Sequence, residues 1–271
     1  MLRAADVWFA YDERTPVLRA VTLEAPADGL IGILGPNGSG KTTLLRLLAG
    51  TRQPQRGTVT LGGTPLRSLS RTQVARRLAV VPQETHLAFD YTVAEVAMMG
   101  RYPHLGAFEI EGPEDIRIVD DALAATGTLG LRQRPFTTLS GGEKQRVVIA
   151  SALAQVRSAY PAGPAYLLLD EPTASLDLRY QLEVISVLRE LHQHRGLAVV
   201  VSTHDLNLAA TLCRTLVMLR EGVVIAAGAT DAVLTRANIR ELYGVDADVV
   251  QHPSGHRLVI PLGRASDGGR A

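Results

Sequence analysis

The sequence of 271 residues has one cysteine, Cys213, and no excess of charge of either sign. A single cysteine excludes a disulfide within the chain and is typical of a reducing compartment. The 28 Lys and Arg residues are balanced by 27 Asp and Glu residues, which leaves a net charge of +1. This balance gives no reason to propose a nucleic acid as a partner.

Long apolar runs are also missing. No run approaches the roughly 20 residues of a membrane-spanning helix, and residues 1–10 have Asp6 where a signal peptide would have an apolar core. We therefore expect a soluble chain whose role at a membrane, if any, comes through a partner. The 46% hydrophobic and 20% charged content is typical of a globular protein, large enough for one α/β domain with an insertion.

The chain is organised around residues 35–42, Gly-Pro-Asn-Gly-Ser-Gly-Lys-Thr. They follow a buried-strand pattern at 30–34 and open a helical pattern, which is the context that the motif G-x-x-x-x-G-K-[ST] requires. Glycines let backbone N–H groups approach phosphate oxygens, and the start of the helix adds its positive dipole end. The alternative is a glycine-rich turn that binds nothing. The predicted nucleotide-binding residues here are Gly35, Pro36, Asn37, Gly38, Ser39, Gly40, Lys41, Thr42 and Thr43.

Within this phosphate loop, two side chains have distinct expected roles. Lys41 should contact the β- and γ-phosphates as a point charge, and the Thr42 hydroxyl should hold Mg²⁺. Two residues at the ends of predicted strands could join them. The Tyr11 ring could stack on an adenine or simply pack at a strand edge. Gln83 could reach a metal ion or water in the site, although a loop Gln is more commonly solvated.

A second helix start lies at residues 139–143, Leu-Ser-Gly-Gly-Glu. Ser140 and Glu143 have the spacing of a capping box. One interpretation is only that a helix begins here. The other is that the Ser140 hydroxyl and the N–H groups of Gly141 and Gly142 form a second anion site, and the spacing alone does not choose between the two.

Acidic and basic side chains follow two further buried-strand patterns. Asp170 and Glu171 end the run at 166–171, where open α/β sheets place their ligands, and buried acids cost free energy unless paired or metal-bound. We expect Asp170 to be the Mg²⁺ partner and Glu171 to orient or deprotonate the attacking water; the alternative is a helix N-cap. His204 ends the run at 197–201 and could contact a γ-phosphate, although a lone His is usually structural. His192 and His194 are expected to be solvated.

Periodicity predicts the remaining organisation. Short strands are expected at 2–9 and 17–23, helices between about 84 and 160 with a loop at 101–106, and a strand pair at 216–219 and 223–227. From about residue 245 we expect a short polar strand or loop, with 263–271 disordered.

Taken in chain order, these residues resemble the motifs of the ATP-binding cassette superfamily, the ATPase subunits of ABC transporters. The resemblance covers most of the chain: Tyr11 resembles the A-loop residue, 35–42 Walker A, Gln83 the Q-loop residue, 139–143 the signature, Asp170 and Glu171 the end of Walker B, 175–177 the D-loop and His204 the switch. Walker A is shared by many unrelated ATPases, whereas the signature at this position is close to diagnostic. Glu143 stands where Gln is commoner, which leaves the Ser and Gly donors intact.

The resemblance implies a fold. It is an α/β P-loop ATPase core, a mostly parallel sheet flanked by helices, with an N-terminal antiparallel β subdomain and an inserted helical subdomain. Residues 1–245 would form the ATPase domain with the helical subdomain inserted at about 84–160, and residues 246–271 a short C-terminal extension with a disordered end.

The resemblance also implies a mechanism. Two copies would pack head to tail, so that Walker A of one and the signature of the other close on the same ATP. Glu171 would act on the water, His204 would hold the γ-phosphate, and Gln83 would link Mg²⁺ to the helical subdomain. ATP binding would close the dimer and hydrolysis would reopen it. The ATP-binding residues outside the phosphate loop would be Tyr11, Ser140, Gly141, Gly142, Glu143 and Asp177.

The implied partners are a permease dimer in the membrane, docked on the helical subdomain, and indirectly a periplasmic or lipoprotein substrate-binding protein. The chain would lie peripherally on the cytoplasmic face of the inner membrane. Residues 98–105 and 202–210 resemble the subunits that energise uptake of ferric siderophores, haem or cobalamin. The alternatives are the ATPase of a two-chain exporter and a non-transport ATPase of the superfamily. Among non-transport members, those of DNA repair have a long coiled coil where this sequence has a short helical insert. Those that act on ribosomes usually have two cassettes, and this sequence has one.

Overall fold

The computed structural model describes residues 1–12, 15–85, 87–156, 163–253 and 255–265. Its centre is a six-stranded sheet in the order β10-β9-β3-β8-β7-β6, in which β10 alone is antiparallel to its neighbour. Parallel strands with both faces covered have near-continuous apolar sequences, as seen here. The strands are β3 (Leu30–Leu34), β6 (Leu78–Val81), β7 (Tyr166–Asp170), β8 (Ala198–Thr203), β9 (Thr215–Arg220) and β10 (Val223–Ala229).

A second, antiparallel sheet forms the N-terminal part in the order β2-β1-β4-β5. Together the two sheets and their helices form the mostly parallel α/β fold with an antiparallel N-terminal sheet that the resemblance implied. The strands of this second sheet are β1 (Leu2–Ala10), β2 (Pro16–Ala25), β4 (Arg56–Leu61) and β5 (Thr64–Pro65).

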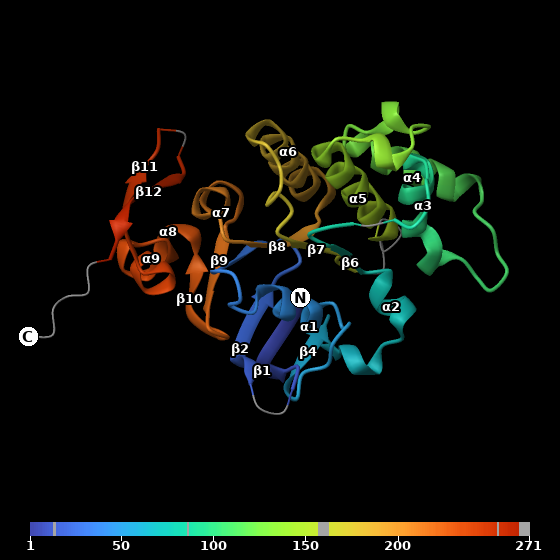
Figure 1. Ribbon diagram of the computed structural model, residues 1–271. Helices are drawn as coiled ribbons and strands as arrows, with labels where there is room; N and C mark the ends of the chain where they lie inside the picture. Colours follow the sequence, from blue (N-terminus) through green and yellow to red (C-terminus); the bar gives the residue numbers. More distant parts are fainter. Residues whose placement is uncertain (13–14, 86, 157–162, 254, 266–271) are drawn as a thin grey trace, which may run out of the picture.

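Side chains that alternate along the central strands point into two different cores. Leu167 and Leu169 belong to one core and Tyr166 and Leu168 to the other, as the period-two alternation of a strand requires. The first core is shared with α5 (Gly141–Val156), α6 (Leu178–Arg195) and α7 (Leu206–Leu212) above the sheet; the second is shared with α1 (Lys41–Leu48) and the antiparallel sheet below it (Figure 1).

Helices α3 (Val93–Met98) and α4 (Pro113–Ala125) pack against α5 to form the inserted helical part. The predicted loop at 101–106 is wrong for residues 101–104, because Met99–His104 forms the 3-10 helix η2. Arg101 holds it there: its side chain is buried, pairs with Asp115 at 2.9 Å and donates to the carbonyl of Ala154. A buried Arg needs such partners, and periodicity does not reveal them. The shorter helices here are η3 (Leu129–Leu131) and η4 (Phe136–Thr138).

The C-terminal residues form more regular structure than expected. After α8 (Thr230–Val233) and α9 (Arg236–Tyr243), strands β11 (Val245–Gln251) and β12 (Arg257–Arg264) pair as an antiparallel hairpin. The prediction of disorder from residue 263 is wrong for Gly263 and Arg264, which pair with Asp246 and Val245. Residues 266–271 lie outside the described part.

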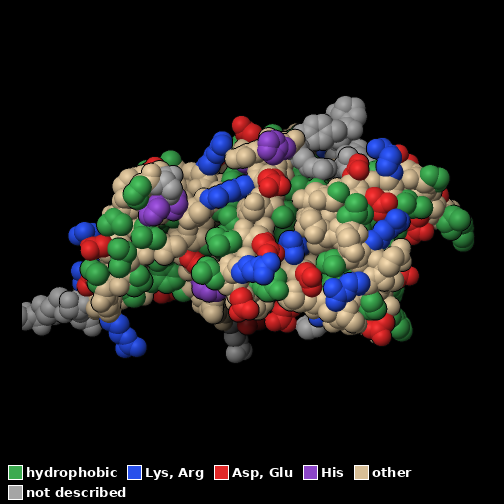
Figure 2. Space-filling view, turned by 90° about the horizontal axis from the view of Figure 1, so that it is seen from above, with side chains coloured by type: hydrophobic (Ala, Val, Ile, Leu, Met, Phe, Trp, Pro, Cys, Tyr) green, Lys and Arg blue, Asp and Glu red, His purple; other side chains and the backbone are tan. Residues whose placement is uncertain are grey.

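Two further observations concern the whole surface. None of the helices in the described ranges combines the length and the apolar character that crossing a membrane requires. On the face seen from above, acidic and basic side chains are interspersed (Figure 2). The remaining helices, η1 (Leu66–Ser68) and α2 (Arg71–Ala75), connect β5 to β6.

Candidate functional site

The phosphate loop links β3 to α1 in the conformation that its glycines were expected to allow. Gly38 and Gly40 have φ values of +79° and +104°, in the left-handed region that favours glycine. A Cβ on Gly40 would meet Leu18, so packing also requires a glycine there, whereas a Cβ on Gly38 would meet nothing within 4 Å. The loop is therefore packed on one side and open on the other.

Helix α1 begins without a side-chain cap, since Gly40 is its N-cap. Its first N–H groups thus keep their capacity for an anion. Ser39 is 3% exposed, and its Oγ has no hydrogen-bond partner among the described residues. A buried hydroxyl with no partner beside uncapped N–H groups fits a phosphate-binding loop.

Lys41 has a buried side chain whose ammonium group is held by three oxygen atoms. Its Nζ donates to the carbonyls of Gly35 at 2.8 Å and Pro36 at 3.1 Å, and lies 3.1 Å from Oε1 of Glu171. The loop and the tip of β7 are thus joined by an ion pair in which both side chains are largely buried. Such a pair costs desolvation, which the carbonyl contacts offset.

Glu171 also contacts the histidine at the tip of β8. Its Oε2 lies 3.0 Å from Nδ1 of His204. Glu171 has a φ of +44°, an unusual and costly conformation for a residue with a side chain. The carboxylate therefore lies between a cation and an imidazole, at the end of the sheet where a reacting water is expected.

Ser202 is a site residue that the sequence analysis missed. It is fully buried, its hydroxyl donates to Oδ1 of Asp170 at 2.6 Å, and it accepts from the N–H of Glu171 at 3.0 Å. Ser202 thus fixes both acidic residues. Its place two residues before the histidine, on the strand paired with β7, was the only available signal.

A hollow of about 340 Å³ lies at this site. It brings Gln83 and Glu171 together with the loop residues. The described residues that line it do not include the signature. They are Val17, Asn37, Gly38, Gly40, Lys41, Thr42, Thr43, Gln83 and Glu171.

The donors around this hollow fit Mg²⁺ bound together with a triphosphate. Thr42 and Gln83 line the hollow and offer a hydroxyl and an amide oxygen. Asp170 is not among its described lining residues, but it directly precedes Glu171 at the end of β7 and offers a carboxylate oxygen. These are the hard ligands that Mg²⁺ prefers. The described residues contain no cluster of three or more His, Cys, Asp or Glu side chains that could hold a metal. Mg²⁺ is usually held by one or two such groups plus substrate phosphates, so this donor set suits it.

Tyr11 lies beside the loop helix with half of its side chain exposed. Its hydroxyl is 3.2 Å from Oγ1 of Thr43, and Arg46 donates to it at 3.1 Å. The ring packs edge-on against Phe9, with centroids 4.9 Å apart. The ring is thus half exposed, but Phe9 packs against it and the Arg52 guanidinium lies over it, 5.9 Å from its centroid. A stacking role on adenine stays a prediction.

The signature forms the start of α5 with the capping box that the spacing predicts. Ser140 Oγ accepts from the N–H of Glu143 at 3.3 Å, and Glu143 Oε2 accepts from the N–H of Ser140 at 2.8 Å. The hydrogen bond from the backbone N–H of Ser140, together with one that the Ser140 hydroxyl donates to the same carboxylate oxygen at 3.0 Å, holds the pKa of Glu143 below its ordinary value. Gly142 is also required by packing, because a Cβ there would lie 2.4 Å from the Tyr180 ring.

Asp177 and its neighbours are exposed around the start of α6. Asp177 is the N-cap residue of α6, yet its side chain makes no capping hydrogen bond. Leu178 and Leu182 are 71% and 58% exposed. Apolar and acidic groups are thus available next to the signature helix.

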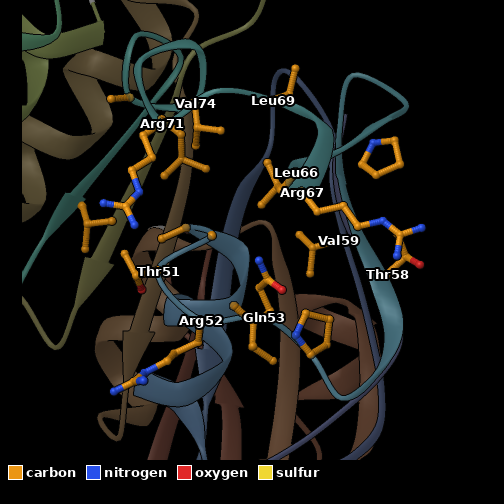
Figure 3. Close-up of a pocket in the computed structure, with 18 of the residues that line it drawn as sticks. Thr51, Arg52, Gln53, Thr58, Val59, Leu66, Arg67, Leu69, Arg71 and Val74 are labelled. Atoms are coloured by element: carbon orange, nitrogen blue, oxygen red, sulfur yellow. The ribbon is translucent and has the colours of Figure 1, made fainter.

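A second, larger hollow of about 860 Å³ lies where the core meets the helical part. Figure 3 shows its walls: residues after α1, strand β4 and the η1–α2 segment, with Arg52, Arg67 and Arg71 among them. Gln155 of α5 also lines it and donates to the carbonyls of Ala75 and Leu78. This hollow is therefore sensitive to the position of α5.

Comparison with known proteins identifies close relatives. A family model described as ABC transporter matches residues 18–174. The hemin import ATP-binding protein HmuV of Gloeobacter violaceus is 46% identical over 267 residues, covering 98% of this chain and 96% of that protein. The HmuV protein of Bordetella pertussis is 44% identical over 249 residues, covering 90% and 94%.

The other matches include a relative named for a different cargo and two solved structures. The cobalamin import ATP-binding protein BtuD of Halobacterium salinarum is 44% identical over 234 residues, covering 86% of this chain and 56% of that protein. A metal-chelate type ABC transporter in an inward-facing conformation has a TM-score of 0.82 at 28% identity, with 96% of each chain covered. The dimeric cassette MJ0796 has a TM-score of 0.72 at 26% identity, covering 85% and 99%.

Proposed function

The chain belongs to the ABC transporter family, whose ATP-binding subunits are ATPases coupled to transport, and we propose that it powers import of a metal chelate, with haem as the first candidate cargo. Support for haem comes from the HmuV proteins, which match nearly the whole chain, whereas the cobalamin relative matches 86% of it. Ferric siderophores are the third cargo class that the proposal covers. The observation that supports the ATPase role is the contact of Glu171 with both Lys41 of the phosphate loop and His204 at the tip of β8.

In this proposal the phosphate loop binds the triphosphate of ATP and the tips of β7 and β8 act on the water. Lys41 exchanges its carbonyl and carboxylate partners for phosphate oxygens, which releases Glu171 to orient the water and accept its proton. His204 holds that carboxylate and the γ-phosphate. Thr42, Asp170 and Gln83 would hold Mg²⁺, which neutralises charge on the phosphates.

The proposal requires a second copy of the chain. The signature does not line the hollow at the phosphate loop among the described residues, yet it stands at the start of α5, where Gly141 is exposed. Exposed Asp177 and Leu178 flank it. We propose a head-to-tail dimer in which Ser140, Gly141, Gly142 and Glu143 of each copy close on the ATP of the other, as the dimeric likeness supports.

A permease dimer in the inner membrane is the proposed site of attachment, with this chain on its cytoplasmic face. The larger hollow suits a cytoplasmic segment of that permease with acidic side chains, because three arginines line it and Gln155 connects it to α5. The periplasmic or lipoprotein binding protein would deliver cargo on the far side.

The deciding experiment uses the chain purified with the permease from the same gene neighbourhood and reconstituted in vesicles. Labelled haem, cobalamin and a ferric siderophore are offered in turn, with ATP on the side of this chain. We expect ATP-dependent haem uptake that stops when Glu171 is replaced by Gln. ATP hydrolysis without uptake of any of the three would overturn the importer proposal while leaving the ATPase assignment intact.

A further inference from the structure

The last helix and the C-terminal hairpin hold the segment that carries His204. Tyr243 ends α9, and its hydroxyl donates to the backbone carbonyl of His204 at 2.9 Å. The two residues are 39 positions apart, so this contact connects the end of the chain to the catalytic end of β8.

A second contact connects the hairpin to the helix that follows His204. Asn207, on the first turn of α7, accepts from the N–H of Val259 at 2.8 Å and donates to the carbonyl of Val259 at 3.2 Å. Its amide therefore satisfies both polar groups of one β12 residue, as a neighbouring strand would. Val259 is 2% exposed, so these groups would otherwise be buried without partners.

The C-terminal unit is itself anchored, so it can serve as a fixed support. Arg236 of α9 pairs with Asp248 of β11 at 2.6 Å, and the N–H of Ala265 donates to the carbonyl of Gly244. Strand β11 packs on α9 and strand β12 on α7. The segment from His204 to Asn207 is thus contacted at both ends by the C-terminal unit.

The surroundings of Tyr243 keep its hydroxyl a donor. Burial raises its pKa, and the carboxylates of Asp205 and Glu171 raise it further. On the other side of the same segment, His204 Nδ1 lies 3.0 Å from the carboxylate of Glu171.

We propose that Tyr243 and Asn207 are positioning residues for ATP hydrolysis, holding the backbone of His204 so that its imidazole meets Glu171. This inference rests on the proposed ATPase role of the site. Neither residue touches the hollow at the phosphate loop, so both act through His204. The C-terminal unit is then part of the catalytic apparatus and not a passive extension.

The test is the steady-state kinetics of Tyr243→Phe in the full-length chain. The variant loses one hydroxyl and keeps the ring, so we expect kcat to fall about threefold to tenfold, the effect of one hydrogen bond, with KM for ATP unchanged. Tyr102→Phe is the matched control, since Tyr102 is 59% exposed in the helical part and should keep the wild-type kcat. Asn207→Ala should lower kcat in the same way, and Asn207→Asp should not restore it, because a carboxylate keeps the acceptor for the N–H of Val259 but has no donor for its carbonyl.

A second readout follows His204 itself, through the ring ¹⁵N signals of histidine-labelled chain. We expect the His204 signals to move in Tyr243→Phe and to stay in place in Tyr102→Phe. A wild-type kcat in Tyr243→Phe, or a lowered kcat with unmoved His204 signals, would overturn the inference. If Asn207→Ala does not fold, Tyr243→Phe still decides. Failure of the proposed function is a different result, because the wild type and Tyr102→Phe would then not hydrolyse ATP at all.

Discussion

At the scale of single residues, the charge on Glu171 has two opposing effects. It is the proposed base for the water, and it also pairs with Lys41 where a triphosphate would bind. In Glu171→Gln we expect hydrolysis to fall by about 100-fold or more, because the water loses its base. We expect ATP affinity to rise, because Lys41 no longer has a competing carboxylate.

Phosphate release and equilibrium ATP binding measure these two effects separately. Glu190→Gln on the exposed face of α6 is the matched control and should behave as wild type. Near-normal turnover in Glu171→Gln would contradict the role given to this carboxylate.

The second residue-scale prediction concerns Ser202. Ser202→Ala removes the buried donor to Asp170 and one acceptor for the N–H of Glu171, which keeps the backbone carbonyl of Ser202 at 3.2 Å. We expect the free energy of unfolding to fall by about 1–3 kcal/mol, the cost of unsatisfied buried polar groups. The Mg²⁺ concentration for half-maximal ATPase activity should also rise. Urea unfolding and Mg²⁺ titration check this, and Ser186→Ala on the exposed surface of α6 should change neither.

Cys213 gives a prediction for alkaline pH. Burial raises the pKa of its thiol from 9.0 to about 12. Below pH 9 the thiol is protonated in the folded and unfolded chain, so it has no effect on stability there. Between the two values only the unfolded chain ionises, so the free energy of unfolding should decrease as pH rises, by up to about 1.4 kcal/mol per pH unit. Cys213→Ala should show a smaller decrease above pH 9 in denaturant titrations; equal slopes would contradict the argument.

Residues whose position in the structure follows from sequence spacing were predictable, and those whose position depends on packing were not. The loop 35–42 and the acids at 170 and 171 follow from a motif and a strand end. Ser202 depends on the register of β8 against β7, which no local pattern contains. His192 was expected to be solvated, but it is 8% exposed and its Nδ1 lies 3.1 Å from the carbonyl of Leu197. Its partner lies beyond the end of its own helix, where helical spacing gives no information.

At the scale of elements, the start of α5 has both a structural and a proposed functional role. Ser140 caps the helix through Glu143, and the same hydroxyl is proposed to face the partner's ATP. We expect Ser140→Arg to abolish turnover, because a bulky cation would fill the place of the phosphate. ATP affinity of the isolated monomer should stay nearly unchanged.

Monomer affinity by calorimetry and turnover at high protein concentration measure these two expectations. Ser140→Thr keeps the capping hydroxyl and should retain part of the activity. Loss of monomer affinity in Ser140→Arg would mean that the signature faces its own nucleotide.

The elements themselves were predicted with uneven success. The buried strands 30–34 and 78–81 follow from continuous apolar runs, because both of their faces are covered. From about residue 245 the chain was expected to be a short polar strand or loop, with 263–271 disordered. Strand β12 forms because Asn207 and β11 satisfy the hydrogen-bonding groups of its backbone. Asn207 is 52 positions away from Val259 in the sequence, and no sequence pattern predicted the pairing with β11. Pairing decided the structure there and local propensity did not.

At the scale of the whole molecule, the proposal requires that each ATP contacts two chains. Equal amounts of Lys41→Ala and Ser140→Arg, each inactive alone, provide the test. In a mixed dimer one site joins the intact phosphate loop of the Ser140→Arg chain to the intact signature of the Lys41→Ala chain, and the other site has both defects. Half of the dimers are mixed and one site in two is intact, so we expect about a quarter of the wild-type rate.

If each signature served its own chain, no intact site would exist in any dimer. An inactive mixture in which native mass spectrometry detects mixed dimers would therefore contradict the shared site, and dilution below the dimer dissociation constant should abolish the recovered activity.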